Sequence, residues 1–83
     1  MINPIRIIET LLFASPEPLT EKIARNCLND KTLCLTELVT QLNEEYQSQK
    51  KGIYIEKIAG GYQILTKPKY HIYIQKLNDK SIF

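Results

Sequence analysis

The sequence has no long hydrophobic run and few residues of the kinds that bind metals or form disulfides. It contains two cysteines and one histidine in 83 residues. No apolar stretch is long enough to span a bilayer. The first residues, Met1 to Arg6, lack the basic region and the small-residue cleavage site of a signal peptide. We therefore expect a cytoplasmic protein that does not enter a membrane.

Cysteine and histidine are too few, and too poorly spaced, to predict a metal or redox site. Cys27 and Cys34 fit neither a zinc-binding pair nor a redox CxxC motif. We interpret them as small buried hydrophobic residues in a reducing compartment. His71 has no ligand spacing to either cysteine, and we expect an ordinary residue of the last helix. The sequence predicts no metal and no cofactor.

Catalytic motifs are absent as well. Gly60-Gly61 lacks the further glycines and the lysine of a phosphate-binding loop. One histidine and two helical cysteines cannot supply a Ser-His-Asp or Cys-His arrangement. The acidic pair Glu44-Glu45 would point about 100° apart on a helix and so would not form a shared acid–base site. We predict that the chain is not an enzyme.

The charge balance does not indicate a strong attraction to nucleic acid. Eleven basic and nine acidic residues give a net charge of +2, whereas a nucleic-acid-binding domain is typically strongly basic. The apolar content of 43% is ordinary for a folded chain. A chain of this length allows one small domain with a modest core.

The first predicted helix, from Pro4 to Ala14, is apolar around about half of its circumference. The residues of this arc are Ile5, Ile7, Ile8, Leu11, Leu12 and Ala14. Ile2 and Phe13 extend the arc past Glu9 on the far side. A helix packed on one side of a small domain needs a narrower stripe, so this helix either lies deep in the core or has a second partner.

Two further helices are predicted before residue 48. Thr20 is an expected N-cap, with Glu21 in the first turn. The buried face of this second helix is predicted to comprise Ile23, Ala24, Cys27 and Leu28. The third helix is expected from Thr32 or Leu33 to Gln47. Its core face has the helical spacing of Leu35, Leu38, Val39, Leu42 and Tyr46.

A β-hairpin and a final helix complete the pattern. Strands are expected over Ile53–Ala59 and Tyr62–Thr66, joined by a tight turn at Gly60-Gly61. Leu19 is a candidate for a short third strand. Pro68 suits the first position of a helix that ends near Leu77, with an apolar stripe of Tyr70, Tyr73, Ile74 and Leu77. This order predicts an α+β winged-helix domain with three helices, a two- to three-stranded wing and a closing helix.

The winged-helix outline makes a DNA-binding transcriptional regulator the alternative function. The helix that would enter the major groove is the third. It contains Glu37, Glu44 and Glu45 and no lysine or arginine, although phosphate contacts need cations. Its expected outward residues are Thr36, Glu37, Thr40, Gln41, Asn43 and Glu44.

Basic residues gather elsewhere, around the wing and the last helix. We interpret them as surface residues that favour solubility, namely Lys50, Lys51, Lys57, Lys67, Lys69, Lys76 and Lys80. We therefore expect no sequence-specific DNA binding.

Two segments resemble a known family. The stretches IETLLFASPEPLT, from Ile8 to Thr20, and AGGYQILTKPKY, from Ala59 to Tyr70, closely resemble the N-terminal domain of bacterial segregation and condensation protein B (the ScpB family). The resemblance extends from about Ile5 to Leu77. Pro16 stands where the family often has glycine, Lys69 stands where it often has an acidic residue, and Asn26 to Leu33 matches poorly.

The resemblance implies a non-enzymatic accessory role. Proteins of this family pair as homodimers and bind the kleisin ScpA, which bridges the SMC ATPase in the bacterial condensin complex that compacts and segregates chromosomes. A nucleoid-associated cytoplasmic protein is implied. Because family members usually carry two winged-helix domains, residues 1–83 resemble the N-terminal half of such a protein, and the chain would be a fragment or a truncated product. By resemblance, the N-terminal domain forms the dimer and the second domain makes a major kleisin contact.

The wide apolar arc of the first helix is where we expect self-association. The side chains placed at this surface are Ile2, Ile5 and Phe13, which flank Glu9. Tyr54 and Ile58 are weaker candidates, since one face of the wing would be solvated in a monomer. The alternative is that all these side chains fill the core of a monomer.

Overall fold

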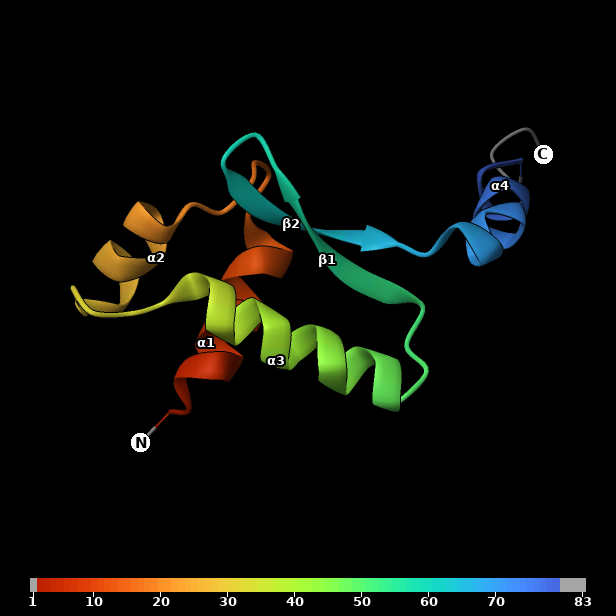
Figure 1. The fold of residues 1–83 in the computed structure, drawn as a ribbon. Coiled ribbons are helices and arrows are strands. Elements are labelled where there is room, and N and C mark those ends of the chain that lie inside the picture. Colours follow the sequence, from red (N-terminus) through yellow and green to blue (C-terminus); the bar gives the residue numbers. More distant parts are fainter. Residues whose placement is uncertain (1, 80–83) are drawn as a thin grey trace.

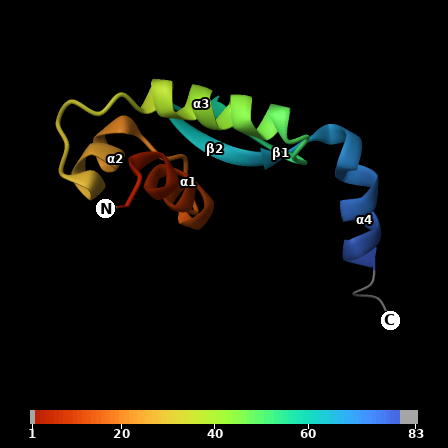
Figure 2. The same ribbon diagram turned by 90° about the horizontal axis from the view of Figure 1, so that it is seen from below.

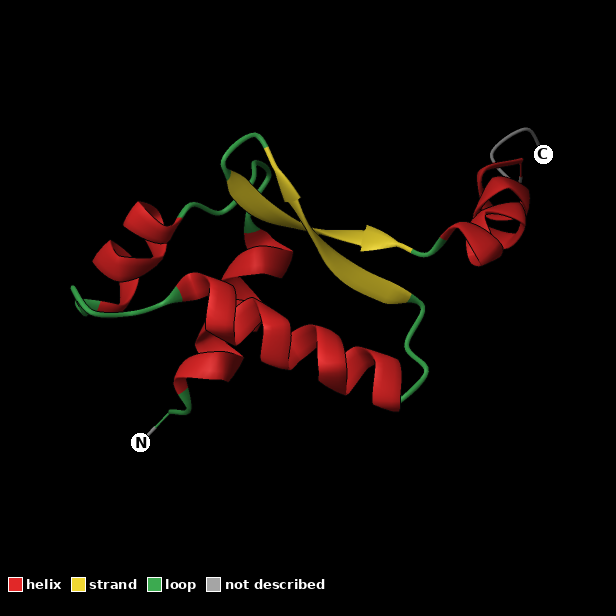
Figure 3. Ribbon diagram, viewed as in Figure 1, coloured by secondary structure: helices red, strands yellow, loops and turns green. Residues whose placement is uncertain are grey.

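The computed structural model describes residues 2–79 and contains three helices, a hairpin and a fourth helix (Figure 1). The elements are α1 (Pro4–Ala14), α2 (Glu21–Leu28), α3 (Leu35–Ser48), β1 (Ile53–Ile58), β2 (Gly61–Thr66), the 3-10 helix η1 (Pro68–Tyr70) and α4 (His71–Asp79). Helices α1 to α3 gather at one end of the molecule, and the twisted hairpin runs from them toward α4 at the other (Figure 3). The arrangement confirms the α+β winged-helix prediction.

Helix α1 has the predicted bounds because both of its ends are closed by local chemistry. The backbone N–H of Ile5 donates to Asn3 Oδ1 at 3.1 Å, and Pro4 occupies the first turn. Ser15 then has extended dihedral angles, as expected for a residue that precedes a proline. Only Ile8 and Leu12 of this helix are fully buried.

Helix α2 begins as predicted but buries a narrower face. The N–H of Ile23 donates to Thr20 Oγ1 at 3.2 Å, which confirms the N-cap. Ala24 is buried and Leu28 half-buried, whereas Ile23 and Cys27 are exposed, contrary to prediction. The helix packs mainly on α1, so only the line through Ala24 and Leu28 meets the core.

The prediction that both cysteines are buried is also wrong. Cys27 and Cys34 are free and exposed. At about 100° per residue, Cys27 lies about 60° round α2 from the buried Ala24. Cys34 is the residue before α3, where its neighbours Leu33 and Leu35 point into the core instead.

Helix α3 begins at Leu35, later than predicted, because a residue of α2 caps it. Cys34 makes no side-chain cap bond, and the N–H of Leu35 donates to Glu21 Oε2 at 3.0 Å. The predicted core face is confirmed. Leu35, Val39, Leu42 and Tyr46 are buried, and Leu38 is half-buried.

The hairpin turns one residue earlier than predicted. Ile58 pairs with Gly61, so Ala59 and Gly60 form the two-residue turn, with φ angles of +50° and +80°. Gly61 is buried in β2 beside the segment before α2, where Leu19 pairs with Tyr62. The predicted third strand is therefore present as a single bridge.

Helix α4 exists after Pro68, as predicted, but it projects away from the three-helix core (Figure 2). Of the residues of η1 and α4, only Tyr70 and Ile74 are half-buried, and none is fully buried. The radius of gyration is 14.7 Å and the long axis 49 Å, against about 12 Å for the radius of a compact domain of this length. The core lies among α1, α2, α3 and the hairpin, and its buried members are Ile8, Leu12, Leu19, Ala24, Leu33, Leu35, Val39, Leu42, Tyr46 and Ile55.

Candidate interaction surface

The residues predicted for the dimer surface do not form one patch. Ile2 and Phe13 are 71% and 84% exposed, but Ile2 precedes the first turn of α1 and Phe13 lies in its last turn. Ile5 is half-buried and packs against the core. Tyr54 and Ile58 are half-buried on β1. Of these residues, Ile2 and Phe13 lie outside the core of the monomer.

The structure does bring Glu9 and Phe13 together, in a groove between α1 and the hairpin. We call this the α1–hairpin groove and define it by two adjoining hollows of about 290 and 320 Å³ that share Phe13, Ile53 and Ile64. The other residues that line the two hollows are Glu9, Thr10, Leu12, Ser15, Tyr46, Gln63, Leu65 and Thr66. No lysine or arginine lines the groove, and its one charged residue is Glu9.

Ile53 and Ile64 are groove residues that the sequence analysis did not assign. The sequence could have indicated them, because apolar side chains alternate onto both faces of the hairpin. Such a pattern is typical of a sheet covered on more than one side. The structure covers only part of each face and leaves these two residues half-buried.

Glu9 is held by a network that joins α1 to α3. Tyr46 donates its hydroxyl to Glu9 Oε2 at 2.6 Å. Arg6 donates to Glu9 Oε1 at 2.7 Å and to Glu45 Oε1 at 2.6 Å. The Tyr46 hydrogen bond is the main reason that the pKa of Glu9 lies below its ordinary value, with Arg6 adding to it. Burial, followed by the bond to Glu9, raises the pKa of Tyr46. Glu9 is therefore an anion at neutral pH.

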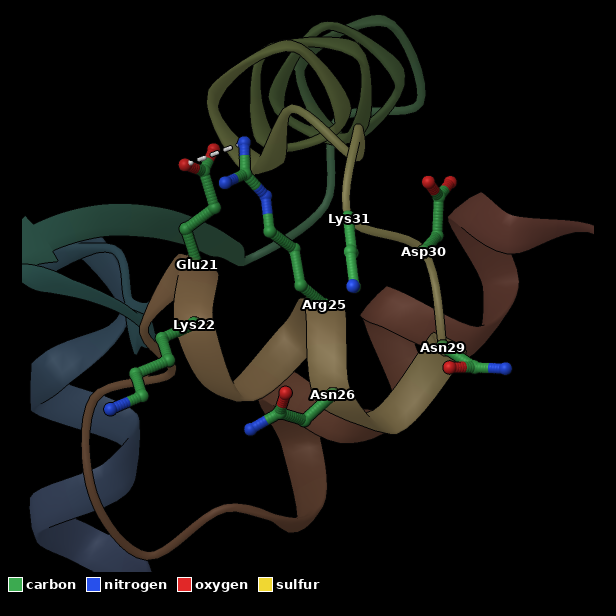
Figure 4. Close-up of a pocket in the computed structure, with 7 residues that line it drawn as sticks. All are labelled: Glu21, Lys22, Arg25, Asn26, Asn29, Asp30 and Lys31. Atoms are coloured by element: carbon green, nitrogen blue, oxygen red, sulfur yellow. Dashed lines mark ion pairs between the residues drawn. The ribbon is translucent and has the colours of Figure 1, made fainter.

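Another hollow, of about 400 Å³, lies beside α2 and the following turn (Figure 4). Arg25 Nη2 lies 3.1 Å from Glu21 Oε1, and Arg25 Nε donates to the carbonyl of Leu33 at 2.9 Å. The other polar side chains of this hollow splay apart rather than converge on one point, namely Lys22, Asn26, Asn29, Asp30 and Lys31 (Figure 4). We assign the Glu21–Arg25 pair to holding the connection between α2 and α3.

Residues 2–79 contain no cluster of three or more side chains that could hold a metal ion. Within the same residues, no helix has the length and apolar character needed to cross a membrane. His71 is the first residue of α4 and is exposed, and its Nε2 lies 3.2 Å from the carbonyl oxygen of Thr66.

The outward face of α3 carries the predicted residues with one exception. Thr36, Glu37, Thr40, Gln41 and Glu44 are exposed. Asn43, predicted to point outward, is half-buried and bonds to the backbone of Ile55 on β1 through both amide atoms. The prediction was wrong because an asparagine can complete the unpaired edge of a strand. Of the lysines around the wing, Lys67 is half-buried and Lys80 lies outside the described residues.

Two hydroxyls on the outward face of α3 already have hydrogen-bond partners. Thr36 Oγ1 lies 2.9 Å from the Tyr62 hydroxyl, and Thr40 Oγ1 donates to the Thr36 carbonyl at 2.9 Å. Together with the carboxylates of α3, these contacts do not favour base readout by this face.

A family model and curated relatives place this chain in the same protein family. The family model for the segregation and condensation complex subunit ScpB matches residues 6–82. Segregation and condensation protein B of Bacillus pumilus is 38% identical over 78 residues, which are 93% of this chain and 40% of that protein. The Clostridium tetani protein of the same name is 38% identical over 71 residues, which are 86% of this chain and 38% of that protein. This chain thus spans about two fifths of the length of these relatives.

Solved structures show the same fold. A conserved hypothetical protein from Chlorobium tepidum matches with a TM-score of 0.81 and 32% identity, over 89% of this chain and 47% of that one. A dimer of the ScpB N-terminal domain complexed with a ScpA peptide matches with a TM-score of 0.76 and 26% identity, over 88% of this chain and 91% of that one. ScpB from Mycobacterium tuberculosis, at 16% identity and a TM-score of 0.85, covers 100% of this chain and 54% of that one, and agrees in fold. The chain belongs to the family of the segregation and condensation complex subunit ScpB.

Proposed function

We propose that this chain is the N-terminal winged-helix domain of a two-domain, non-enzymatic condensin accessory subunit. It pairs as a homodimer and supports binding of the kleisin ScpA, and through it of the SMC ATPase, on the nucleoid during chromosome condensation and segregation. The observation that carries the proposal is the likeness, over 88% of this chain and 91% of the other, to an ScpB N-terminal domain described as a dimer with a ScpA peptide.

The surface of α1 supports the dimer. Phe13 is 84% exposed at the rim of the α1–hairpin groove, and a large aromatic side chain gains most from burial in an interface. Glu9 adds a fixed negative charge to the same groove. We propose Phe13 and Glu9 as the centre of the dimer surface. Ile2, Ile5, Tyr54 and Ile58 would be further contacts that lie outside this patch.

The test of the dimer is Phe13→Glu, followed by analytical ultracentrifugation and circular dichroism. Because Phe13 is outside the core, we expect a folded variant whose self-association is weaker by several kcal/mol, since the side chain is buried once in each subunit at about 1.5–3 kcal/mol. The matched control is Ile23→Glu, which charges an exposed apolar residue on α2 away from the groove. A wild-type chain that stays monomeric at high micromolar concentration would contradict the proposal.

The kleisin is tested separately by calorimetric titration of the wild-type chain with the ScpA of the same organism. We expect saturable binding with a defined number of ScpA molecules per dimer. Dimerisation without any binding of ScpA, to this chain or to a longer protein that contains it, would remove the kleisin from the proposal and leave the dimer.

A further inference from the structure

Helix α4 carries an apolar stripe that its own domain leaves largely uncovered. Tyr73 and Leu77 are 65% and 64% exposed. At about 100° per residue they lie on one face with Tyr70 and Ile74. Ile72 is also exposed, at 57%, but lies on the opposite side of the helix. The stripe is thus a defined face, and Ile72 offers a comparison on the same element.

The base of α4 is held so that the helix points away from the core. The N–H of Lys67 donates to the Gly52 carbonyl at 2.8 Å. The Tyr70 ring packs on Gly52, where an added Cβ would lie 3.3 Å from the ring. Pro68 fixes one backbone angle between these contacts. To lie in the α1–hairpin groove of its own chain, α4 would have to reverse direction here and lose them.

The surface of the whole chain is larger than that of a compact monomer. It exposes 6375 Å², against roughly 5,100 Å² for a compact protein of 9.6 kDa. The surplus of roughly 1,300 Å² exceeds the roughly 800 Å² that each partner buries in a standard interface. The projection of α4 from the rest of the molecule accounts for the elongated shape (Figures 1 and 2).

The α1–hairpin groove is complementary to α4 in apolar character and in charge. It is lined by Phe13, Ile53 and Ile64, and Glu9 is its one charged side chain. The arm formed by η1 and α4 carries Lys69 and Lys76 against one carboxylate, Asp79, within the described residues. The groove ends at Thr66, beside the base of α4. A two-fold dimer would present the same helix and the same groove on both copies.

We infer that two copies of this chain exchange their α4 helices, each placing Tyr73 and Leu77 in the α1–hairpin groove of the other. This inference rests on the proposed dimer and names the elements that form it. Such an exchange buries both unpartnered surfaces at once and leaves the hinge contacts at Gly52 intact. It also gives the domain a dimer contact without any opening of its core.

The first test compares charged variants within α4. Leu77→Glu raises the dissociation constant of the dimer about 100-fold or more, because the residue is buried twice. Ile72→Glu changes it by less than about 3-fold, because a solvent-facing substitution has little effect. Equal effects of the two variants, or no effect of Leu77→Glu, overturn the exchange.

The second test is cross-linking between two chains that carry single cysteines at different positions. Cys27→Ser and Cys34→Ser first remove the exposed native thiols. Thr10→Cys, at the groove, is placed in one chain and Leu77→Cys in the other, and the mixture is treated with a short bismaleimide. We expect a covalent dimer from the mixture, and none when Ile72→Cys replaces Leu77→Cys.

The outcomes separate this inference from the proposed function. A wild-type dimer that gives no cross-link between positions 10 and 77 overturns the exchange and leaves the dimer. A dimer in which the bismaleimide joins Thr10→Cys to a cysteine introduced into an added ScpA segment instead assigns the groove to the kleisin and also overturns the exchange. A monomeric wild-type chain overturns both proposals.

Discussion

Gly61 is the residue at which the hairpin meets the rest of the domain. A Cβ built on it would lie 2.9 Å from the Leu19 carbonyl oxygen and 3.0 Å from the Pro18 carbonyl carbon. The missing side chain therefore permits the pairing of Leu19 with Tyr62. Gly60 has a different role, because it supplies a positive φ in the turn, with open space around it.

We predict that Gly61→Ala destabilises the domain by about 1–3 kcal/mol, the usual range for forcing extra volume into a packed site. Ala59→Gly is the matched comparison and should stabilise it by about 0.5–1 kcal/mol, because Ala59 holds a left-handed conformation that glycine adopts freely. Urea unfolding of both variants measures the effects. A loss of stability in Ala59→Gly would place the turn at Gly60-Gly61 instead.

Glu9 and Tyr46 make the stability of the domain depend on pH. The folded pKa of Glu9 is below its ordinary value of 4.5, chiefly because Tyr46 donates to it. Its contribution is therefore complete above the ordinary pKa. It is lost as the pH falls through the lowered value, where the unfolded chain binds the proton more readily.

We predict that Tyr46→Phe lowers stability by about 1.5–3 kcal/mol at pH 7, since a hydrogen bond to a charged group is lost. Because the main cause of the lowered pKa is removed, the loss of stability below pH 4.5 should also be shallower than in the wild type. Urea unfolding over a pH series measures both, with Tyr54→Phe as the control. An unchanged acid dependence would show that the bond does not govern Glu9.

At the scale of elements, hydrogen bonds from side chains connect α3 to the hairpin and α2 to α3. Asn43 on α3 donates to the Ile55 carbonyl at 2.9 Å and accepts from the Ile55 N–H at 2.8 Å. Ile55 is 4% exposed. Glu21 acts similarly between α2 and α3, because it caps Leu35. These contacts set how α3 crosses β1.

We predict that Asn43→Ala destabilises the domain by about 1–3 kcal/mol, because both backbone groups of Ile55 lose their partner at a buried residue. Gln41→Ala, on the exposed side of the same helix, should stay within about 0.5 kcal/mol of the wild type. Thermal unfolding followed by circular dichroism compares them. Equal effects would mean that water replaces the amide at Ile55.

At the scale of the whole molecule, the charge distribution separates an interaction domain from a DNA reader. The helix that would enter the major groove carries three carboxylates and no cation. The exposed lysines lie mainly near the hairpin and α4. We therefore expect this domain to approach DNA only through weak and dispersed phosphate contacts.

We predict that duplex DNA binds with a Kd no tighter than roughly 10⁻⁴ to 10⁻⁶ M at physiological salt, and more weakly as salt rises. Fluorescence anisotropy over a salt series, with two unrelated duplex sequences, makes the measurement. Nanomolar, sequence-selective binding that is abolished by Thr36→Ala or Gln41→Ala would establish the winged-helix regulator instead.

Much of the fold could be predicted because its signals are local. Proline positions, the Thr20 cap and the spacing of Leu35, Val39, Leu42 and Tyr46 each act within a few residues, so the bounds of α1 and the core face of α3 are as predicted. The family could be predicted for the same reason, since two short motifs at a set spacing carry the resemblance. The candidate surface was only partly predictable. Phe13 and Glu9 could be placed on α1, but not beside Ile53 and Ile64.

Tertiary structure alone decided which apolar and polar residues are covered. Cys27, Asn43 and Gly61 were each misplaced, because distant segments decide how they are covered. The packing of α2 on α1 decides which face of α2 is buried, Ile55 binds Asn43, and Leu19 lies against Gly61. The direction of α4 likewise depends on Gly52, which helical periodicity cannot reveal. The sequence by itself determined the order of the helices and strands and most of their bounds, because side-chain periodicity and most caps act within a few residues. The start of α3 is the exception, since Glu21 of α2 caps it. Packing between elements determined which faces remain free, because burial depends on neighbours far apart in the chain.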